Sequence, residues 1–173
     1  MNEIASNIIN NFKLPKFSEI PDVGLFLEQT AKYVNGYLSC LGNVNLTTSM
    51  ISNYVKKGMI ANPIKKQYYR EQIAYIFFIA LAKTVLSLED IQVMMNIVPT
   101  ISDCENAYGL FCDEFDKSLR RVFTKEDLYP TENSGTSSSQ EMRLLKNTVV
   151  AVTHKIYLDS AFAAIRSEKK EVE

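Results

Sequence analysis

The sequence predicts a mainly α-helical fold, in which a winged helix-turn-helix with a small β-hairpin wing is followed by a C-terminal helical dimerisation region. Three observations favour this fold. A capped helix, a glycine and a hairpin-like segment follow one another between Leu46 and Arg70. Basic residues without acidic ones gather in the same part of the chain. The last predicted helix carries two apolar stripes, so it needs two partners.

The second helix of the predicted helix-turn-helix covers residues 47–57. Thr47 can cap the free N–H groups of its first turn, and Leu46 and Ile51 occupy the two positions of a hydrophobic staple. Gly58 follows and can adopt the left-handed conformation that ends a helix. The sequence therefore indicates both ends of this helix.

A β-hairpin wing is predicted over residues 59–69. Met59-Ile60 would form its first strand, Ala61-Asn62-Pro63 its turn, and the mostly polar residues 64–69 its return strand. In a helix-turn-helix the second helix enters the major groove of DNA. This helix and the wing are therefore the first candidates for a functional surface.

Charge separates this segment from the rest of the chain. The whole sequence has 19 Lys and Arg against 20 Asp and Glu. Between Gln29 and Arg70 there are six basic residues and no acidic one, so the remainder has 13 basic against 20 acidic residues. Such clustering is expected where a protein meets phosphates, although a merely solvated surface is the alternative. The six residues are Lys32, Lys56, Lys57, Lys65, Lys66 and Arg70.

The chain is predicted to have three parts. Residues 1–21 form an N-terminal arm, because Pro15 and Pro21 interrupt a continuous helix. Residues 22–98 form the winged helix-turn-helix domain, and residues 99–173 form a C-terminal region of a helix, a serine-rich loop and a long helix. The expected core contacts of the arm are Leu14, Phe17, Ile20 and Val23. Further helices are expected at about 22–41, 70–85, 87–98, 102–123 and 140–166, with the serine-rich loop at 131–140.

The two apolar stripes of the last helix predict a dimer. One stripe can pack on the chain's own helix at residues 108–122, and a second copy of the protein is the most economical partner for the other. A twofold dimer also suits DNA, because paired recognition helices match paired half-sites. The expected dimerisation residues are Leu145, Val149, Val152 and Ile156 in one stripe, with Leu158, Phe162 and Ile165 in the other.

Other function classes find little support in the sequence. The apolar run Ile73–Ala82 is about half a membrane span, and the N-terminus lacks the features of a secretory signal, so we expect a cytoplasmic protein with no membrane partner. Three cysteines without CxxC spacing and one histidine predict free thiols, with no metal and no cofactor. No enzyme is expected, because Asp113, Glu114 and Asp116 lack a partner nucleophile and are interpreted as a solvated helix face.

Residues Met50–Ile60, followed by Tyr69-Arg70-Glu71 and Ser87–Ile91, resemble the MerR-type DNA-binding domain over about residues 24–98. That family has a recognition helix ending in a tyrosine, a basic residue and Lys-Gly-Leu-Ile, then a wing, then two helices of which the second begins Ser-Leu-Glu-Glu-Ile. A closer resemblance, which includes residues 14–29 and the segment Tyr68–Ile73, is to an uncharacterised bacterial family, domain of unknown function eighteen thirty-six. This closer resemblance implies a related fold but no assigned activity.

The sequence also departs from the MerR pattern. Ser52 and Asn53 stand where the recognition helix usually has an arginine and a first tyrosine, and the wing has Tyr68-Tyr69-Arg70 in place of the usual Tyr-Arg order. We therefore expect phosphate anchoring with a different set of base-reading residues. The effector-binding cysteines of metal-sensing relatives have no counterpart.

Together these observations predict a dimeric, sequence-specific transcriptional regulator that binds double-stranded DNA. Asn53 is the best candidate for a base contact, because its amide matches the N6/N7 edge of adenine. Facing the major groove we expect Thr48, Ser49, Ser52 and Asn53. Holding phosphates we expect Lys56, Lys57, Lys65, Lys66, Arg70 and the hydroxyls of Tyr54 and Tyr68.

Two other hypotheses remain open from the sequence. A winged helix can serve as a protein-interaction module, here through Met59, Ile64, Tyr68 and the acidic C-terminal helices. Alternatively, the C-terminal helices can enclose an unknown small-molecule effector. The aromatic residues that would line such a pocket are Tyr108, Phe111, Phe115, Tyr157 and Phe162, although packing of a core is the commoner use of such a set.

Overall fold

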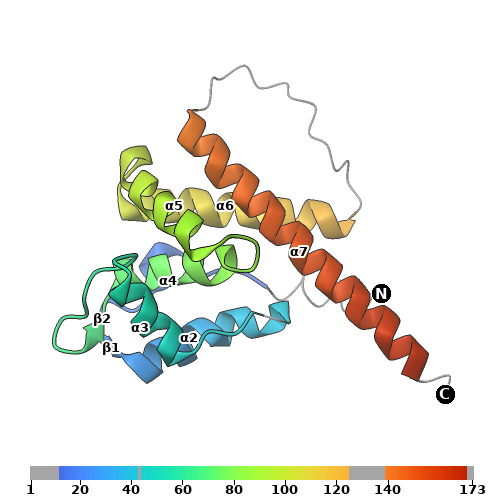
Figure 1. Ribbon diagram of the computed structural model, residues 1–173, viewed down its shortest axis with the longest axis horizontal. Coiled ribbons are helices and arrows are strands. Elements are labelled where there is room, and N and C mark those ends of the chain that lie inside the picture. Colours follow the sequence, from blue (N-terminus) through green and yellow to red (C-terminus); the bar gives the residue numbers. More distant parts are fainter. Residues whose placement is uncertain (1–11, 43, 125–138, 171–173) are drawn as a thin grey trace.

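The computed structural model describes residues 12–42, 44–124 and 139–170 (Figure 1). It confirms a mainly helical protein with one small antiparallel sheet. Its helices are α2 (Leu27–Leu38), α3 (Thr48–Lys56), α4 (Arg70–Ala82), α5 (Leu88–Ile101), α6 (Cys104–Thr124) and α7 (Gln140–Lys170), with short 3-10 turns η1 (Phe17–Glu19) and η2 (Ser39–Leu41). The sheet consists of β1 (Leu25–Phe26) and β2 (Gln67–Tyr68).

Helix α4 forms the centre of the fold. It is apolar on nearly every side, as the sequence predicts, and its residues from Gln72 to Ala82 are buried apart from Tyr75. Phe77 is fully buried, and its ring lies edge-on to Tyr37, with 5.7 Å between centroids. One continuous hydrophobic cluster extends from the arm through α4 to α6 and α7. The two ends of the molecule therefore share a core.

The first helix begins later than predicted. Residues 25–26 pair with β2 as a strand, and α2 starts at Leu27 and not near Asp22. The side chain of Gln29 accepts a hydrogen bond of 2.9 Å from the backbone N–H of Phe26, which fixes this start. The other end of this helix lies near the predicted position. The 3-10 turn η2 follows α2, and Gly42, with a φ of +82°, ends the helical segment.

The arm packs on the core mainly as expected. Leu14 and Ile20 are buried, whereas Val23 is exposed, so its predicted core contact is wrong. Arg70 ties the arm to α4: its Nε donates 2.9 Å to the carbonyl of Ile20, and its guanidinium lies 3.6 Å from the carboxylate of Asp22. The same group lies 5.7 Å from the centre of the Phe17 ring.

The C-terminal helices also differ slightly from the prediction. Helix α5 continues through Pro99 to Ile101 and does not end before the proline, because the residue before a proline is disfavoured but not excluded from the helical conformation. Helices α6 and α7 are in contact and cross at an oblique angle (Figure 1), and a buried hydrogen bond of 2.7 Å joins the hydroxyls of Ser118 and Thr153 between them. Most of the predicted serine-rich loop lies outside the described residues. None of the described helices has the length and apolar character needed to cross a membrane.

Candidate nucleic-acid interface

Helix α3 has the caps that the sequence predicts. The hydroxyl of Thr47 accepts a hydrogen bond of 3.2 Å from the N–H of Met50, and both staple residues, Leu46 and Ile51, are buried. A hydrophobic staple fixes the angle at which the chain enters a helix. The N–H of Thr47 also lies 3.3 Å from the sulfur of Met50, so two hydrogen bonds and two buried apolar side chains hold the start of α3.

The C-terminal end of α3 is a Schellman motif. Gly58 has a φ of +70°, and its N–H donates 2.9 Å to the carbonyl of Val55. The next N–H, of Met59, reaches back 2.9 Å to the carbonyl of Tyr54. This pair of bonds is the usual end of a helix at a left-handed glycine. It turns the chain into the core, where Met59 and Ile60 are buried.

Side chains from two neighbouring helices hold α3 in place. Asn35 of α2 bonds both backbone groups of Leu46, with its amide donating 2.7 Å and its carbonyl accepting at 2.9 Å. From α5, the Gln92 amide donates 2.8 Å to the carbonyl of Lys57. These anchors fix both ends of α3. Sequence patterns gave no signal for them, because each joins residues far apart in the chain.

The outward face of α3 is polar. Ser52 donates a hydrogen bond of 3.0 Å back to the carbonyl of Thr48, so its hydroxyl oxygen remains able to accept. The side chain of Asn53 is half-buried. Of the predicted groove-facing set, the exposed residues are Ser49 and Ser52 and the half-buried ones are Thr48 and Asn53.

The wing has a different geometry from the prediction. The chain reverses at Lys65-Lys66 and not at Ala61-Asn62-Pro63: the backbone groups of Ile64 and Gln67 exchange hydrogen bonds of 3.0 and 2.9 Å around the two lysines. The return strand then pairs with β1, so that Phe26 faces Gln67. The predicted first strand, Met59-Ile60, is unavailable because its side chains fill the core.

Both lysines of this turn adopt positive φ, +49° for Lys65 and +66° for Lys66. A two-residue hairpin loop with two positive φ values normally contains Asn and Gly, since other side chains are strained there. Lys65-Lys66 gives no such signal, whereas the asparagine and proline at 62–63 are typical turn residues, so the sequence predicts the turn there. Two exposed ammonium groups at strained positions stand at the tip of the loop.

Hydrogen bonds also hold the base of the wing. The Gln72 amide donates 3.0 Å to the carbonyl of Ala61 and 3.2 Å to that of Asn62, while its oxygen accepts 2.9 Å from Tyr69. On the other side, the amide of Gln67 reaches the carbonyl of Gly24 at 3.3 Å. A Cβ at Gly24 would lie 2.6 Å from that of Gln67, so this close approach requires glycine.

Three residues of the predicted phosphate-binding set lie in the core or at its edge. Tyr54 is fully buried, its hydroxyl has no hydrogen-bond partner, and burial raises its pKa to about 12. Tyr68 is also buried. Arg70 holds the arm through Ile20 and Asp22. For Tyr54 the sequence could not decide between core and surface, because a tyrosine on a short amphipathic helix fits either face. The environments of Tyr68 and Arg70 depend on β1 and the arm, which lie far away in the sequence.

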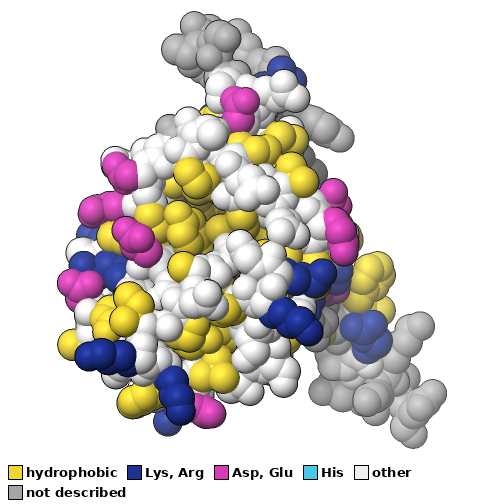
Figure 2. All heavy atoms as spheres, turned by 60° about the vertical axis from the view of Figure 1, so that its left-hand side comes forward, with side chains coloured by type: hydrophobic (Ala, Val, Ile, Leu, Met, Phe, Trp, Pro, Cys, Tyr) yellow, Lys and Arg dark blue, Asp and Glu magenta, His cyan; other side chains and the backbone are white. Residues whose placement is uncertain are grey.

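Four lysines remain exposed on this side of the molecule: Lys56, Lys57, Lys65 and Lys66. Among the described residues, none of them lies within 4 Å of a carboxylate. Figure 2 shows basic side chains in the lower half of the molecule, which contains α2, α3 and the wing, while acidic ones occur mainly above. On this face, basic side chains therefore predominate in the lower half and acidic ones in the upper half, with some of the opposite sign in each.

The predicted dimerisation residues of α7 divide into two groups. Leu145, Val149, Val152 and Ile156 are buried within the chain's own core, where α7 packs on α6, so this is the stripe whose partner lies inside the chain. Leu158, Phe162 and Ile165 are exposed, to 47%, 54% and 46%. Figure 1 shows the C-terminal part of α7 extending beyond α6, so α6 does not cover this end of α7.

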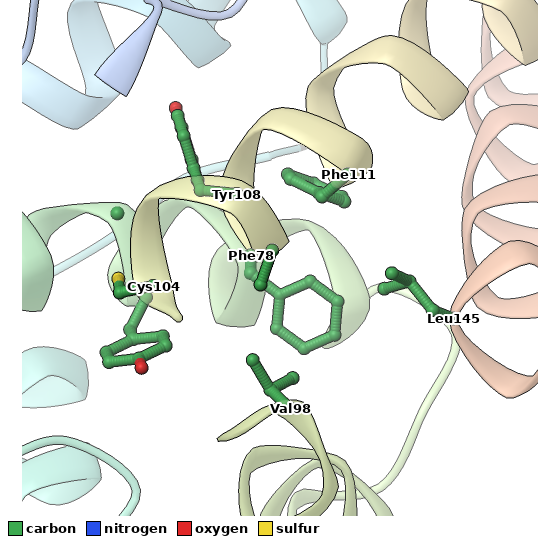
Figure 3. A pocket seen from close by; sticks show the side chains of 9 residues that line it. Phe78, Val98, Cys104, Tyr108, Phe111 and Leu145 are labelled. Atoms are coloured by element: carbon green, nitrogen blue, oxygen red, sulfur yellow. The ribbon is translucent and has the colours of Figure 1, made fainter. Parts of the chain in front are cut away.

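The predicted aromatic pocket does not form as one cavity. Phe115 is buried in the core, Tyr157 packs on Phe123 with 5.4 Å between ring centroids, and Phe162 is exposed. Tyr108 and Phe111 do border a different, apolar space between α4, α5, α6 and α7 (Figure 3). Its volume of about 20 Å³ holds roughly one water molecule. The other residues that line this space are Ala74, Tyr75, Phe78, Val98, Cys104, Ala107 and Leu145.

The remaining candidates for reactive or metal-binding groups are the cysteines and the acidic side chains of α6. Burial raises the pKa of the Cys104 thiol to about 11 and that of Cys112 to about 12, so both are neutral at pH 7. Within the described ranges, no three His, Cys, Asp or Glu side chains gather as metal ligands. On α6, Asp116 and Glu114 form surface ion pairs with Arg120 and Lys117, as a solvated face would.

Comparison with known proteins gives one match. Residues 15–111, more than half of the 173-residue chain, match the family described as domain of unknown function DUF1836. The match begins in the arm and ends within α6, so it crosses both predicted domain boundaries, at residues 21/22 and 98/99. No curated protein and no solved structure matches the chain.

Proposed function

The chain belongs to the family described as domain of unknown function DUF1836, and we propose that it is a sequence-specific DNA-binding regulator of transcription. In this proposal the elements from β1 to α5 act as a MerR-like winged helix-turn-helix. Helix α3 enters the major groove, and the Lys65-Lys66 turn is the tip of the wing on the phosphate backbone. The order strand, helix, helix, wing, strand, helix supports this assignment.

The observation that carries the proposal is the set of four exposed lysines on α3 and the wing. They lie in a segment with no Asp or Glu from residue 29 to 70, and no ion pair to a described residue neutralises them. Leaving like charges together destabilises a protein unless an outside anion is bound. DNA phosphates supply such an anion, and lysines at a helix end and a loop tip can contact them.

Base reading is assigned to the polar face of α3. Asn53 can pair with the N6/N7 edge of adenine, and the hydroxyls of Thr48, Ser49 and Ser52 can bond either type of base. The anchors from Asn35 and Gln92 keep this face rigid, so little conformational entropy is lost on binding.

The active species in this proposal is a cytoplasmic homodimer. The stripe Leu158, Phe162 and Ile165 recurs at spacings of four and three residues, which places it on one face of α7. Its three large apolar side chains are exposed. Contact between two such stripes would remove them from water and relate two α3 helices by a twofold axis.

The test is a binding titration of the purified protein against fragments of its own genome at several salt concentrations. We expect tight retention of a few fragments, with affinity that falls steeply as salt rises. The double variant Lys56→Glu, Lys66→Glu should lose this retention. The control, Lys117→Glu with Lys146→Glu, makes the same change of charge on α6 and α7 at exposed positions and should bind normally.

Failure of the wild-type protein to retain any fragment at low salt would reject DNA binding. It would leave the protein-interaction module as the main alternative, with α3 and the wing as a scaffold. Equal loss of binding in both double variants would show that net charge alone, and not this surface, is responsible. A small molecule released from the denatured protein and detected by mass spectrometry would support an effector.

A further inference from the structure

The small sheet carries an exposed apolar pair beside the wing lysines. Gln67 is paired with Phe26 on one side and with Ile64 on the other. Side chains of directly opposed residues lie on the same face of a sheet, so Phe26 and Ile64 flank Gln67 on one face. They are exposed to 48% and 61%. Figure 2 shows apolar and basic side chains next to each other at the lower left.

The position of Ile64 is rigid. Its N–H and carbonyl are both bonded to Gln67, at 3.0 and 2.9 Å, and it immediately precedes the Lys65-Lys66 turn. Gln67 is itself bonded to Gly24. An exposed isoleucine held in this way loses little further conformational freedom when a partner covers it. The entropic cost of binding at this position is therefore small.

The partner must offer anionic and apolar surface within a few ångströms. A DNA minor groove meets both needs, because its walls are phosphates and its floor is the edges of stacked bases. Minor-groove proteins insert apolar side chains such as isoleucine between base pairs, unstack them partly and bend the DNA toward the major groove. A protein partner would have to be both acidic and apolar to match the lysines and Ile64 together.

We propose that the wing enters the minor groove next to the α3 site, with Ile64 as an apolar wedge in a base step and Lys65 and Lys66 on the flanking phosphates. This inference rests on the proposed DNA-binding function. The backbones of the two hairpin strands lie about 4.8 Å apart, so with its side chains the wing is wider than the undistorted groove of about 6 Å. The proposal therefore requires the groove to widen as the duplex bends. Phe26, on the same face, would cover the sugar of the widened groove.

The experiment uses full-length protein and a duplex of about 30 base pairs obtained by binding-site selection. Donor and acceptor dyes at its ends report bending by energy transfer, and 2-aminopurine at the presumed step reports unstacking. We expect wild-type protein to bend the duplex and raise the 2-aminopurine emission. Ile64→Ala should abolish both signals and weaken binding about tenfold, with an unchanged salt slope. Ile64→Leu should retain both signals.

Two matched variants separate the wedge from other effects. Lys66→Ala should lower the salt slope by about 0.9, the value of one phosphate contact, and keep the bend. Val93→Ala removes a comparably exposed apolar residue on α5 and should change neither property. Wild-type binding without bending, or normal bending by Ile64→Ala, would overturn this inference alone. Absence of any DNA binding by wild type would reject the proposed function and the wedge together.

Discussion

Helix α3 with its wing and the α6–α7 pair use charged side chains in opposite ways. The lysines of α3 and the wing have no carboxylate partner among the described residues. On α6 and α7 three ion pairs join residues one helical turn apart: Glu114–Lys117, Asp116–Arg120 and Lys155–Asp159. Each such pair stabilises its own helix by about 0.3–0.5 kcal/mol and offers little to a partner. Arg121, Arg143 and Lys146 on the same two helices form no ion pair among the described residues either, so α3 and the wing are distinguished by positive charge in a segment without Asp or Glu.

The two regions also differ in what fixes them. Side chain to backbone hydrogen bonds from Asn35, Gln72 and Gln92 hold α3 and the wing. Apolar packing holds α6 against α7, and among the described residues one side-chain hydrogen bond, Ser118–Thr153, joins the two helices. Directional bonds keep a polar surface in one geometry, while apolar contacts supply most of the free energy of folding. Both regions nevertheless meet on α4.

The largest expected effect comes from breaking that shared core. Phe77→Ala should lower the free energy of unfolding by about 3–5 kcal/mol, because it leaves a cavity among Tyr33, Tyr37 and Tyr108. Urea unfolding followed by circular dichroism and by tyrosine fluorescence should show one transition, shifted equally for both signals. Phe26→Ala, at an exposed position, is the control and should cost little. Two separate transitions would mean that the regions fold independently.

The dimer prediction tests the second role of α7. Phe162→Asp should shift the protein from dimer to monomer in sedimentation equilibrium, because the substitution occurs twice in a twofold interface. Loss of about 1.5 kcal/mol in each copy corresponds to about 100-fold weaker association. Val93→Asp on α5 should leave the dimer intact. A wild-type protein that sediments as a monomer would contradict the role assigned to this stripe.

A base-reading residue should change preference more than total affinity. Asn53→Ala should cost about 1–3 kcal/mol at one base position and leave the salt slope unchanged, since no phosphate contact is removed. Binding-site selection with wild-type and variant proteins measures this directly. An identical selected motif for the two proteins would show that Asn53 does not read a base.

For Tyr54 we expect a substitution to change the stability of the protein and not its binding to DNA. Its hydroxyl is buried without a partner, so Tyr54→Phe should raise the free energy of unfolding by about 1 kcal/mol and leave DNA affinity unchanged. Weaker DNA binding at unchanged stability would restore the phosphate contact that the sequence suggested for this residue.

The limits of prediction differ between these regions. The ends of α3 followed from the sequence because caps, staples and left-handed glycines are local features: Thr47, Leu46, Ile51 and Gly58 all act within a few residues. The buried character of α4 followed for the same reason, since apolar residues on every side of one helix need no knowledge of its partners.

The missed features depend on distant contacts. The sheet joins β1 to β2 across more than forty residues. Because residues 25–26 form a strand of this sheet, α2 begins later than the sequence predicts. The sequence predicts that Arg70 binds phosphate, because no local pattern reveals its partners in the chain. These partners, Ile20 and Asp22, lie far away in the sequence. The turn at Lys65-Lys66 was missed because its residues contradict the local preference of such turns.

That contradiction supplies the smallest and most selective prediction. Lys65→Asn with Lys66→Gly places at each position the residue that positive φ favours, so the free energy of unfolding should rise by about 1 kcal/mol. DNA affinity should fall, and its salt slope should decrease by about 1.8 because two phosphate contacts are lost. Lys56→Gln with Lys57→Gln is the matched control, because it removes the same charge from positions without positive φ and should weaken binding with no gain in stability. If the wing variant is stabilised and still binds normally, the strained lysines have no role at the DNA. If it is stabilised and binds weakly, the strain is retained for the contact that those lysines make.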